Sequence, residues 1–296
     1  MPVSYRCADA ADDRREPLLA TASQVRGWVL IEVRGAWGED AVHDSALAGY
    51  VPRDWRDRLK RHQARVVCIR SHLRTAADGI RLFACVARRP GRGPAPLWTH
   101  EVGALAEVVP TVDQLARHGE EALGWERVDH QLVLVCTNGR HDQCCANRGR
   151  PVVRALRESR WADHVWECSH IGGDRFAANV VVLPDSLYFG RVEADSAVPL
   201  LESLEAGRID LQCYRGRTSL TLAEQAVEHF VRRELALDAV DAITFADRDD
   251  GAFVVRINER RVRVRLARHM VSVAEPLTCH GRPEQLVPRF DLLSIE

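Results

Sequence analysis

QLVLVCTNGRHDQCC at residues 131–145 and HVWECSHIGGD at residues 164–174 are the two segments from which the fold of this chain can be worked out. Each begins with an apolar run typical of a buried strand and ends in a polar loop that carries cysteine or histidine. Open α/β sheets place functional side chains just past the carboxyl ends of neighbouring strands. The pattern therefore predicts that Cys136, Cys144, Cys145, Cys168 and His170 gather at one site.

The region around these segments predicts a βαβ unit followed by a ββα unit, which is the thioredoxin-like arrangement. A helix is predicted to begin at Pro151, because proline is favoured at the first helical position. Asp195 is the predicted N-cap of a later helix that ends at Gly207. The predicted strands span residues 131–136, 164–168, 178–183 and 187–192.

The first half of the chain predicts a similar order of elements. Residues 1–24 are polar and acidic, and we expect them to be a loosely packed lead-in. No cysteine follows the first predicted strand, so we expect a degenerate unit that lacks the site. The predicted strands span residues 27–33, 65–70, 80–87 and 97–102, and the predicted helices span residues 52–63 and 111–118.

The last part of the chain predicts a smaller unit. Thr221 and Glu224 form a predicted capping box for a helix that reaches residue 235, and three strands are expected at 239–246, 252–257 and 261–266. The predicted fold class is α/β, with two thioredoxin-like (βαβ-ββα) units in tandem plus a small C-terminal helix and antiparallel meander. The predicted domains are 1–125, 126–212, which carries the site, and 213–296.

Composition excludes several classes of protein. The chain has 296 residues and a formal net charge of −1, which gives no broad attraction to nucleic acid. No apolar run approaches the roughly 18 residues of a membrane span, and no signal-peptide pattern stands at the start. We expect a cytoplasmic protein that binds neither nucleic acid nor membranes.

The nine cysteines are expected to be reduced thiols, because cytosolic chains of this length rarely contain a disulfide framework. Cys68 and Cys85 lie inside apolar runs, where cysteine behaves as a small hydrophobic residue. Cys7, Cys213 and Cys279 have no cysteine nearby in the sequence, and we expect no partner for them. This leaves the central group as the candidate site.

Thiolate and imidazole ligands on two loops are the donors that an iron–sulfur cluster requires. Cys136 and Cys145 can enclose one side of a cluster, and His170 can approach from the opposite loop. The fourth donor stays open, with Cys144 and Cys168 as candidates. A structural zinc ion held by Cys136, Cys145, Cys168 and His170 is one alternative. A thiol-disulfide oxidoreductase that uses Cys136, Cys144 and Cys145 is another, although the C-x-x-C motif is absent.

Four short motifs resemble the sucrase/ferredoxin-like family of thioredoxin-fold [2Fe–2S] proteins. The resemblance is densest over residues 131–192. It rests on Cys136, Asp142 and Cys145, on SHIGG at 169–173, on RFAAN at 175–179 and on YFGRV at 188–192.

The resemblance implies a [2Fe–2S] cluster held by Cys136, Cys145 and two histidines four positions apart. His170 matches the first histidine, and Asp174 stands at the position of the second. It further implies an electron carrier or redox sensor, rather than an enzyme, that exchanges electrons with a partner protein such as a reductase. Histidine ligation raises the potential of a cluster relative to four cysteines. The sequence shows no carboxylate pair of the kind that glycoside hydrolysis needs.

Overall fold

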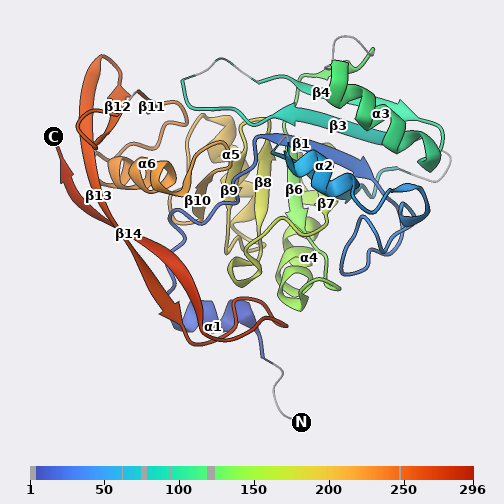
Figure 1. Ribbon diagram of the computed structural model, residues 1–296, viewed down its shortest axis with the longest axis horizontal. Helices are drawn as coiled ribbons and strands as arrows, with labels where there is room; N and C mark the ends of the chain where they lie inside the picture. The colour runs from blue at the N-terminus through green and yellow to red at the C-terminus, as the bar shows by residue number, and fades with distance from the viewer. Residues whose placement is uncertain are drawn as a thin grey trace.

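The protein is a mixed α/β fold built on one large sheet. The computed structural model describes residues 5–61, 63–74, 79–91, 93, 95–118, 124–246 and 248–296. Within these residues, ten strands form a continuous sheet with helices packed against it, and four further strands form a separate antiparallel sheet (Figure 1). The predicted α/β class is confirmed.

The first half of the large sheet is built around β1. Strand β2 pairs with β1 in parallel, β3 pairs with β1 in antiparallel, and β4 and β5 extend the sheet beyond β3. Buried apolar residues line both faces of β1, because helices cover one face and the rest of the chain covers the other. The bounds are β1 Gly27–Glu32, η1 Ala48–Tyr50, α2 Trp55–Arg61, β2 Ala64–Arg70, β3 Ile80–Val86, β4 Leu97–Val102, α3 Leu105–His118 and β5 Glu126–Val128.

The second half repeats this strand order around β6. Strand β7 is parallel to β6, β8 is antiparallel to it, and β9 and β10 follow at the edge. The strand order agrees with two thioredoxin-like units, and the tandem description and the domain limits stay predictions. The bounds are β6 Leu132–Cys136, α4 Gln143–Arg157, η3 Ala162–His164, β7 Val165–Cys168, η4 Asp174–Phe176, β8 Val180–Leu183, β9 Leu187–Phe189, α5 Ala197–Glu205 and β10 Tyr214–Arg217.

Helix α4 begins earlier than the sequence predicts. It starts at Gln143, and Pro151 lies within it. The Asp142 side chain caps the helix by accepting a hydrogen bond from the backbone N–H of Cys144, at 2.8 Å. The prediction of a start at Pro151 was wrong, and Cys144 and Cys145 consequently lie in the first turn of α4.

The two halves of the sheet meet at one short seam. Strand β2 pairs with β7 in antiparallel, and the paired residues are Ile69 with Cys168 and Arg70 with Glu167. Ser169 strengthens the seam, because its backbone N–H donates to Cys68 at 2.8 Å and its hydroxyl accepts from Cys68 at 3.0 Å. The loop that follows β7 therefore lies against the first half of the chain.

Residues 1–24 are not a loose lead-in across the part that the structure describes. Residues Cys7–Asp13 form helix α1, in which Cys7, Ala8 and Ala11 are buried. Arg148 of α4 donates to Asp12 at 2.6 Å, and Arg191 also pairs with Asp12. The sequence prediction failed because the segment is rich in aspartate, and only these three small residues, on one narrow face of α1, are buried.

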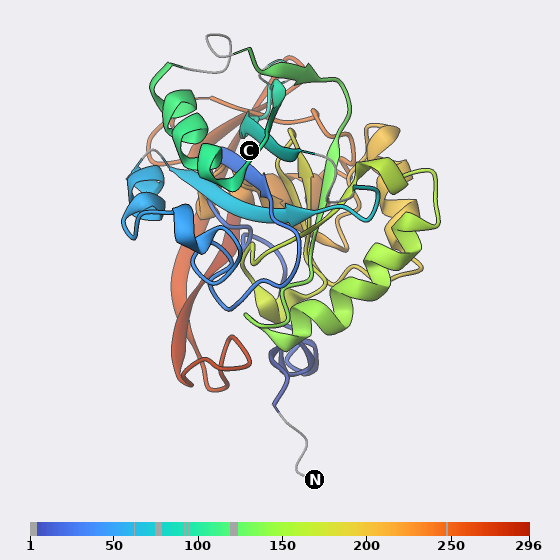
Figure 2. The same ribbon diagram turned by 90° about the vertical axis from the view of Figure 1, so that its right-hand side faces the viewer.

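The C-terminal unit has four strands where the sequence predicts three. Strand β13 is longer than predicted and pairs with β14, which was not predicted. The β13–β14 hairpin runs from α6 to α1 (Figures 1 and 2). The bounds are α6 Leu222–Glu234, β11 Thr244–Phe245, β12 Phe253–Ile257, β13 Arg260–Val273 and β14 Gln285–Ile295.

A buried charge network joins α6 to β10 of the large sheet. Glu228 accepts hydrogen bonds from the Tyr214 hydroxyl at 2.9 Å, from Arg232 at 2.9 Å and from Arg217 at 3.3 Å. The side chains of Glu228, Arg217 and Arg232 have no solvent exposure. Burial raises the pKa of Glu228, but Arg232 and Arg217 lower it more, so this pKa lies below its ordinary value.

None of the helices among the described residues combines the length and the apolar character needed to cross a membrane.

Candidate metal centre

Three predicted site residues come together at the carboxyl ends of β6 and β7. Cys136 ends β6, Cys145 lies in the first turn of α4, and His170 lies in the loop after β7. One potential ligand atom from each lies within 4.8 Å of the others. Both cysteines are buried, and a quarter of the His170 side chain is exposed. The structure thus brings Cys136, Cys145 and His170 into one group.

Two glycine positions make this approach possible. A Cβ atom at Gly149 would lie 2.2 Å from the carbonyl oxygen of Cys136, so only glycine lets α4 pack this closely against the end of β6. Gly173 has a φ of +83°, and a Cβ atom there would lie 2.3 Å from the buried guanidinium of Arg215. The turn that contains Gly173 brings Asp174 back toward His170.

Asp174 is a buried carboxylate beside this group. Its Oδ1 atom accepts from the Cys145 thiol at 3.1 Å and lies 2.8 Å from His170 Nδ1. Burial raises the pKa of Asp174, but the contacts with His170, Cys145 and His141 outweigh burial and hold this pKa below its ordinary value. Asp174 is therefore an anionic oxygen donor beside a thiol and an imidazole.

The sulfurs of Cys136, Cys145 and the neighbouring Cys168 do not hold their protons equally. The pKa of Cys136 is lowered, because the Cys145 and Cys168 thiols both hydrogen-bond to its sulfur and outweigh the effect of burial. The contact with Cys136, together with burial, raises the pKa of Cys145, and burial raises the pKa of Cys168. A metal prefers the thiolate form as a ligand, and Cys136 is the sulfur on which that form is stabilised.

Cys168 and Cys144 occupy different positions from those that one common site requires. Cys168 pairs with Cys136 across the parallel strands, and it is outside the group that includes His170. The Cys144 sulfur lies 3.5 Å from Cys279 and belongs to a second group with Cys7 and Asp142. The expectation that Cys7 and Cys279 lack partners was wrong, because folding joins residues that lie far apart in the sequence.

His141 is a site residue that the sequence analysis missed. Its ring stacks on that of His170, with 3.7 Å between centroids and 26° between planes. Its Nε2 atom lies 3.8 Å from Asp174 Oδ2. His141 lies in the loop between Cys136 and Cys145, and this position is the only signal that the sequence offers for it.

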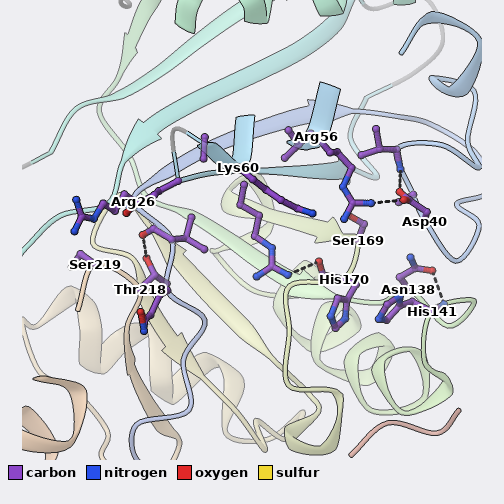
Figure 3. A pocket seen from close by; sticks show the side chains of 18 of the residues that line it. Arg26, Asp40, Arg56, Lys60, Asn138, His141, Ser169, His170, Thr218 and Ser219 are labelled. Carbon is purple, nitrogen blue, oxygen red and sulfur yellow. Dashed lines mark hydrogen bonds and ion pairs between the residues drawn. The ribbon is translucent and has the colours of Figure 1, made fainter. Parts of the chain in front are cut away.

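The two histidines border a pocket of about 920 Å³ between the halves of the chain. Figure 3 shows His141 and His170 side by side on one wall, opposite Arg56 and Lys60 of α2. Arg56 pairs with Asp40 inside the pocket. The cationic residues of the lining outnumber its carboxylates, and they are Arg26, Arg56, Lys60, Arg65 and Arg89.

A family model described as sucrase/ferredoxin-like matches residues 18–216, which include both halves of the large sheet. The chain belongs to the sucrase/ferredoxin-like family. The predicted family is thereby confirmed, and it relates this fold to that of iron–sulfur proteins.

Curated relatives of this sucrase/ferredoxin-like chain match only part of it. "Altered inheritance of mitochondria protein 32" of Saccharomyces cerevisiae is 32% identical over 100 residues, which cover 29% of this chain and 32% of the yeast protein. The protein of the same name in Saccharomyces kudriavzevii is 31% identical over the same shares. This chain therefore spans about a third of the length of these relatives.

Among solved structures, the sucrase/ferredoxin-like chain is similar to the thioredoxin-like [2Fe–2S] ferredoxin of Aquifex aeolicus. The identity is 21%, the match covers 29% of this chain and 91% of the ferredoxin, and the TM-score is 0.27. A cysteine-to-serine variant of that ferredoxin gives 22% identity over 30% of this chain and all of its own, with a TM-score of 0.28.

Proposed function

We propose that this protein carries a [2Fe–2S] cluster and works as an electron carrier or a redox sensor. The observation that carries the proposal is the group formed by Cys136, Cys145 and His170, whose ligand atoms lie within 4.8 Å of one another at the ends of β6 and β7. Membership of a ferredoxin-like family supports the same chemistry.

The donor set of this group fits an iron–sulfur cluster. Two buried thiols supply the soft ligands that iron–sulfur chemistry needs. His170 Nδ1 is buried and lies 2.8 Å from the Asp174 carboxylate, so the imidazole is held beside the two thiols. The adjoining pocket gives the imidazole room to move away from the thiols.

We propose Asp174 as the fourth ligand. Its Oδ1 atom contacts both the Cys145 sulfur and His170 Nδ1. His141, in contrast, falls in a group with His170 and Asp174 that includes neither cysteine. Cys168 is a softer donor, but it faces Cys136 rather than His170. Oxygen is a hard ligand, so an Asp174 ligand makes this site differ from the family pattern.

The bound cluster would supply one-electron chemistry, and the chain's own residues would control access to it. Cys136 and Cys145 lie on the buried side, while His170 and His141 face the pocket. An electron would therefore enter or leave on the histidine side. The excess of arginine and lysine around this pocket favours a redox partner protein with an acidic surface. All nine cysteines are free thiols, which supports a reducing compartment such as the cytoplasm.

A structural zinc ion is the second candidate for this site. Cys168 lies opposite Cys136 on the paired strands β7 and β6, so a shift of its side chain would complete a set of three sulfurs and His170. The thiol-disulfide alternative, with Cys136, Cys144 and Cys145, has less support. Cys144 and Cys145 belong to different groups, and Cys136 and Cys145, which lie together, are both buried away from a substrate.

Metal and sulfide analysis of the full chain, purified without oxygen from iron-replete cells, tests the proposal. We expect iron and acid-labile sulfide in equal amounts, about two of each per chain, with visible absorption. Cys145→Ser is expected to lose both, and the matched control Cys213→Ser, whose half-buried sulfur lies outside both groups, is expected to keep them. A colourless wild-type protein without iron would refute the proposal, and zinc in its place would favour the second candidate.

The fourth ligand has its own test. Asp174→Ala is expected to lose iron, whereas His141→Ala is expected to keep it and to change the absorption only slightly. The opposite pattern would make His141 the ligand.

A further inference from the structure

A second group of metal-binding side chains lies on the other side of α4. Cys7 comes from α1, Asp142 and Cys144 come from the start of α4, and Cys279 comes from the loop between β13 and β14. One ligand atom from each lies within 4.8 Å of the others. Adjacent residues on a helix point about 100° apart, so Cys144 faces this group while Cys145 faces the first. Figures 1 and 2 show α1 beside the tip of the hairpin that carries Cys279.

We propose that Cys7, Cys144, Cys279 and Asp142 form a Zn²⁺ site. A tetrahedral zinc ion with Zn–S distances of about 2.3 Å holds its sulfurs about 3.8 Å apart, and a carboxylate ligand oxygen lies about 3.6 Å from each sulfur. The Cys279 sulfur lies 3.5 Å from that of Cys144 and 3.7 Å from that of Cys7. The Cys7 sulfur lies 3.6 Å from Asp142 Oδ1 and 3.4 Å from Oδ2. Three of the six distances between donors thus match a tetrahedral ligand set, and all six lie within 4.8 Å.

The same distances argue against a disulfide in this group. A disulfide bond is about 2.05 Å long, so the sulfurs of Cys144 and Cys279, which lie 3.5 Å apart, are unbonded thiols in van der Waals contact. A single disulfide would join two of the three thiols and would leave the third thiol and the carboxylate without a role. A metal ion uses all four groups at once.

Surrounding backbone groups hold the donors in place. Asp142 Oδ1 accepts from the N–H of Cys144 at 2.8 Å, and Oδ2 accepts from the N–H of Cys279 at 2.7 Å. Each oxygen keeps a lone pair for a metal, because a carboxylate offers about four acceptor positions. Such hydrogen bonds orient a metal-bound carboxylate.

The site joins three elements that are distant in the sequence. Cys7, Asp142 and Cys144 are buried, and Cys279 is half-buried, so an ion reaches the site from the Cys279 side. Next to this site, the Tyr5 hydroxyl donates a hydrogen bond to the carbonyl oxygen of Pro276 at 2.6 Å. A zinc ion here would fix the first turn of α4, where Cys145 also lies. The inference goes beyond the proposed function and does not depend on it, because the two groups share no ligand.

Titration of the full chain with Zn²⁺ and Co²⁺, after chelation and under reducing conditions without oxygen, tests this site. We expect one thiolate-rich site per chain with the absorption of tetrahedral Co²⁺. Cys279→Ser is expected to weaken binding by more than about 100-fold, because even residues outside the ligand shell typically contribute 10–100-fold. Cys213→Ser is the matched control and should bind as the wild type does. Cys145→Ser should keep this site while it loses iron, which separates the inference from the proposed function.

Protection from alkylation provides a test that needs no variant. Peptide mass spectrometry should show that Zn²⁺ slows the modification of Cys7, Cys144 and Cys279 together, with Cys213 as the unprotected reference. Equal modification with and without Zn²⁺ would overturn the inference. A Cys144–Cys279 disulfide in protein isolated from cells with thiols blocked at lysis, or unchanged Zn²⁺ affinity in Cys279→Ser, would also overturn it.

Discussion

Glu228→Gln is expected to destabilise the whole protein, because Glu228 is the carboxylate that forms ion pairs with two fully buried arginines, Arg217 and Arg232. Its carboxylate accepts from Arg232 at 2.9 and 3.2 Å, from Arg217 at 3.3 Å and from the Tyr214 hydroxyl at 2.9 Å. The substitution keeps the size of the side chain and removes its charge. Both guanidinium groups then stay buried without a compensating negative charge.

The expected loss is about 3 to 5 kcal/mol, the usual result of breaking a buried ion pair on one side. In a chain of this size, 1 kcal/mol corresponds to about 2 °C in Tm, so Tm should fall by about 6 to 10 °C. Thermal unfolding followed by circular dichroism measures this shift, with iron and zinc content matched between samples. Metal binding to the folded state would otherwise raise Tm by mass action.

Glu205→Gln is the matched control for this experiment. Glu205 also pairs with an arginine, Arg160, but about half of each side chain is exposed. Exposed pairs contribute little, and we expect no measurable change in Tm. An equal shift in the two variants, or a shift of less than about 2 °C in Glu228→Gln, would show that burial of the network does not control its energy.

Three further predictions follow from the same structure. Because the folded-state pKa of Glu228 is lowered, its stabilisation is present above the unfolded pKa of about 4.3 and is lost as pH falls through the folded pKa. Denaturant unfolding should therefore show wild-type stability falling below about pH 4, with a smaller fall in Glu228→Gln. Asp174→His, which places a second imidazole where the family pattern has one, should keep the iron that Asp174→Ala loses, as measured by iron per chain. Gly149→Ala should cost about 1 to 3 kcal/mol and lower iron content, since its Cβ would meet the carbonyl oxygen that ends β6. Gly49→Ala, whose Cβ meets nothing within 4 Å, should change neither denaturant midpoint nor iron content.

The strands and the two loops of the first site could be predicted because their signals are local. Cys136 and His170 each follow an apolar run, and parallel strands bring such ends together. The start of α4 was mispredicted because Pro151 is a strong signal for the first helical turn. Asp142 is an equally good N-cap, and it is the one that the fold uses.

The second group could not be predicted in the same way. Cys7 and Cys279 meet only because α1 and the β13–β14 hairpin pack on the same end of α4, and no local pattern records that packing. Strand β14 itself was missed, since Pro288 interrupts its sequence. His141 joins the first site through ring stacking, which the spacing of donors in the sequence does not encode.

The seam between β2 and β7 has the symmetry of a two-subunit protein. Strand order reads the same outward from it in both directions, and antiparallel edge pairing is what a two-fold axis produces where a surface meets its own copy. Because both halves lie in one chain, they need not be identical. One half carries the sulfur and imidazole donors, while the other contributes Arg56 and Lys60 to the facing wall of the pocket. The two subunits of a homodimer cannot differ in this way, because every substitution is present in both of them.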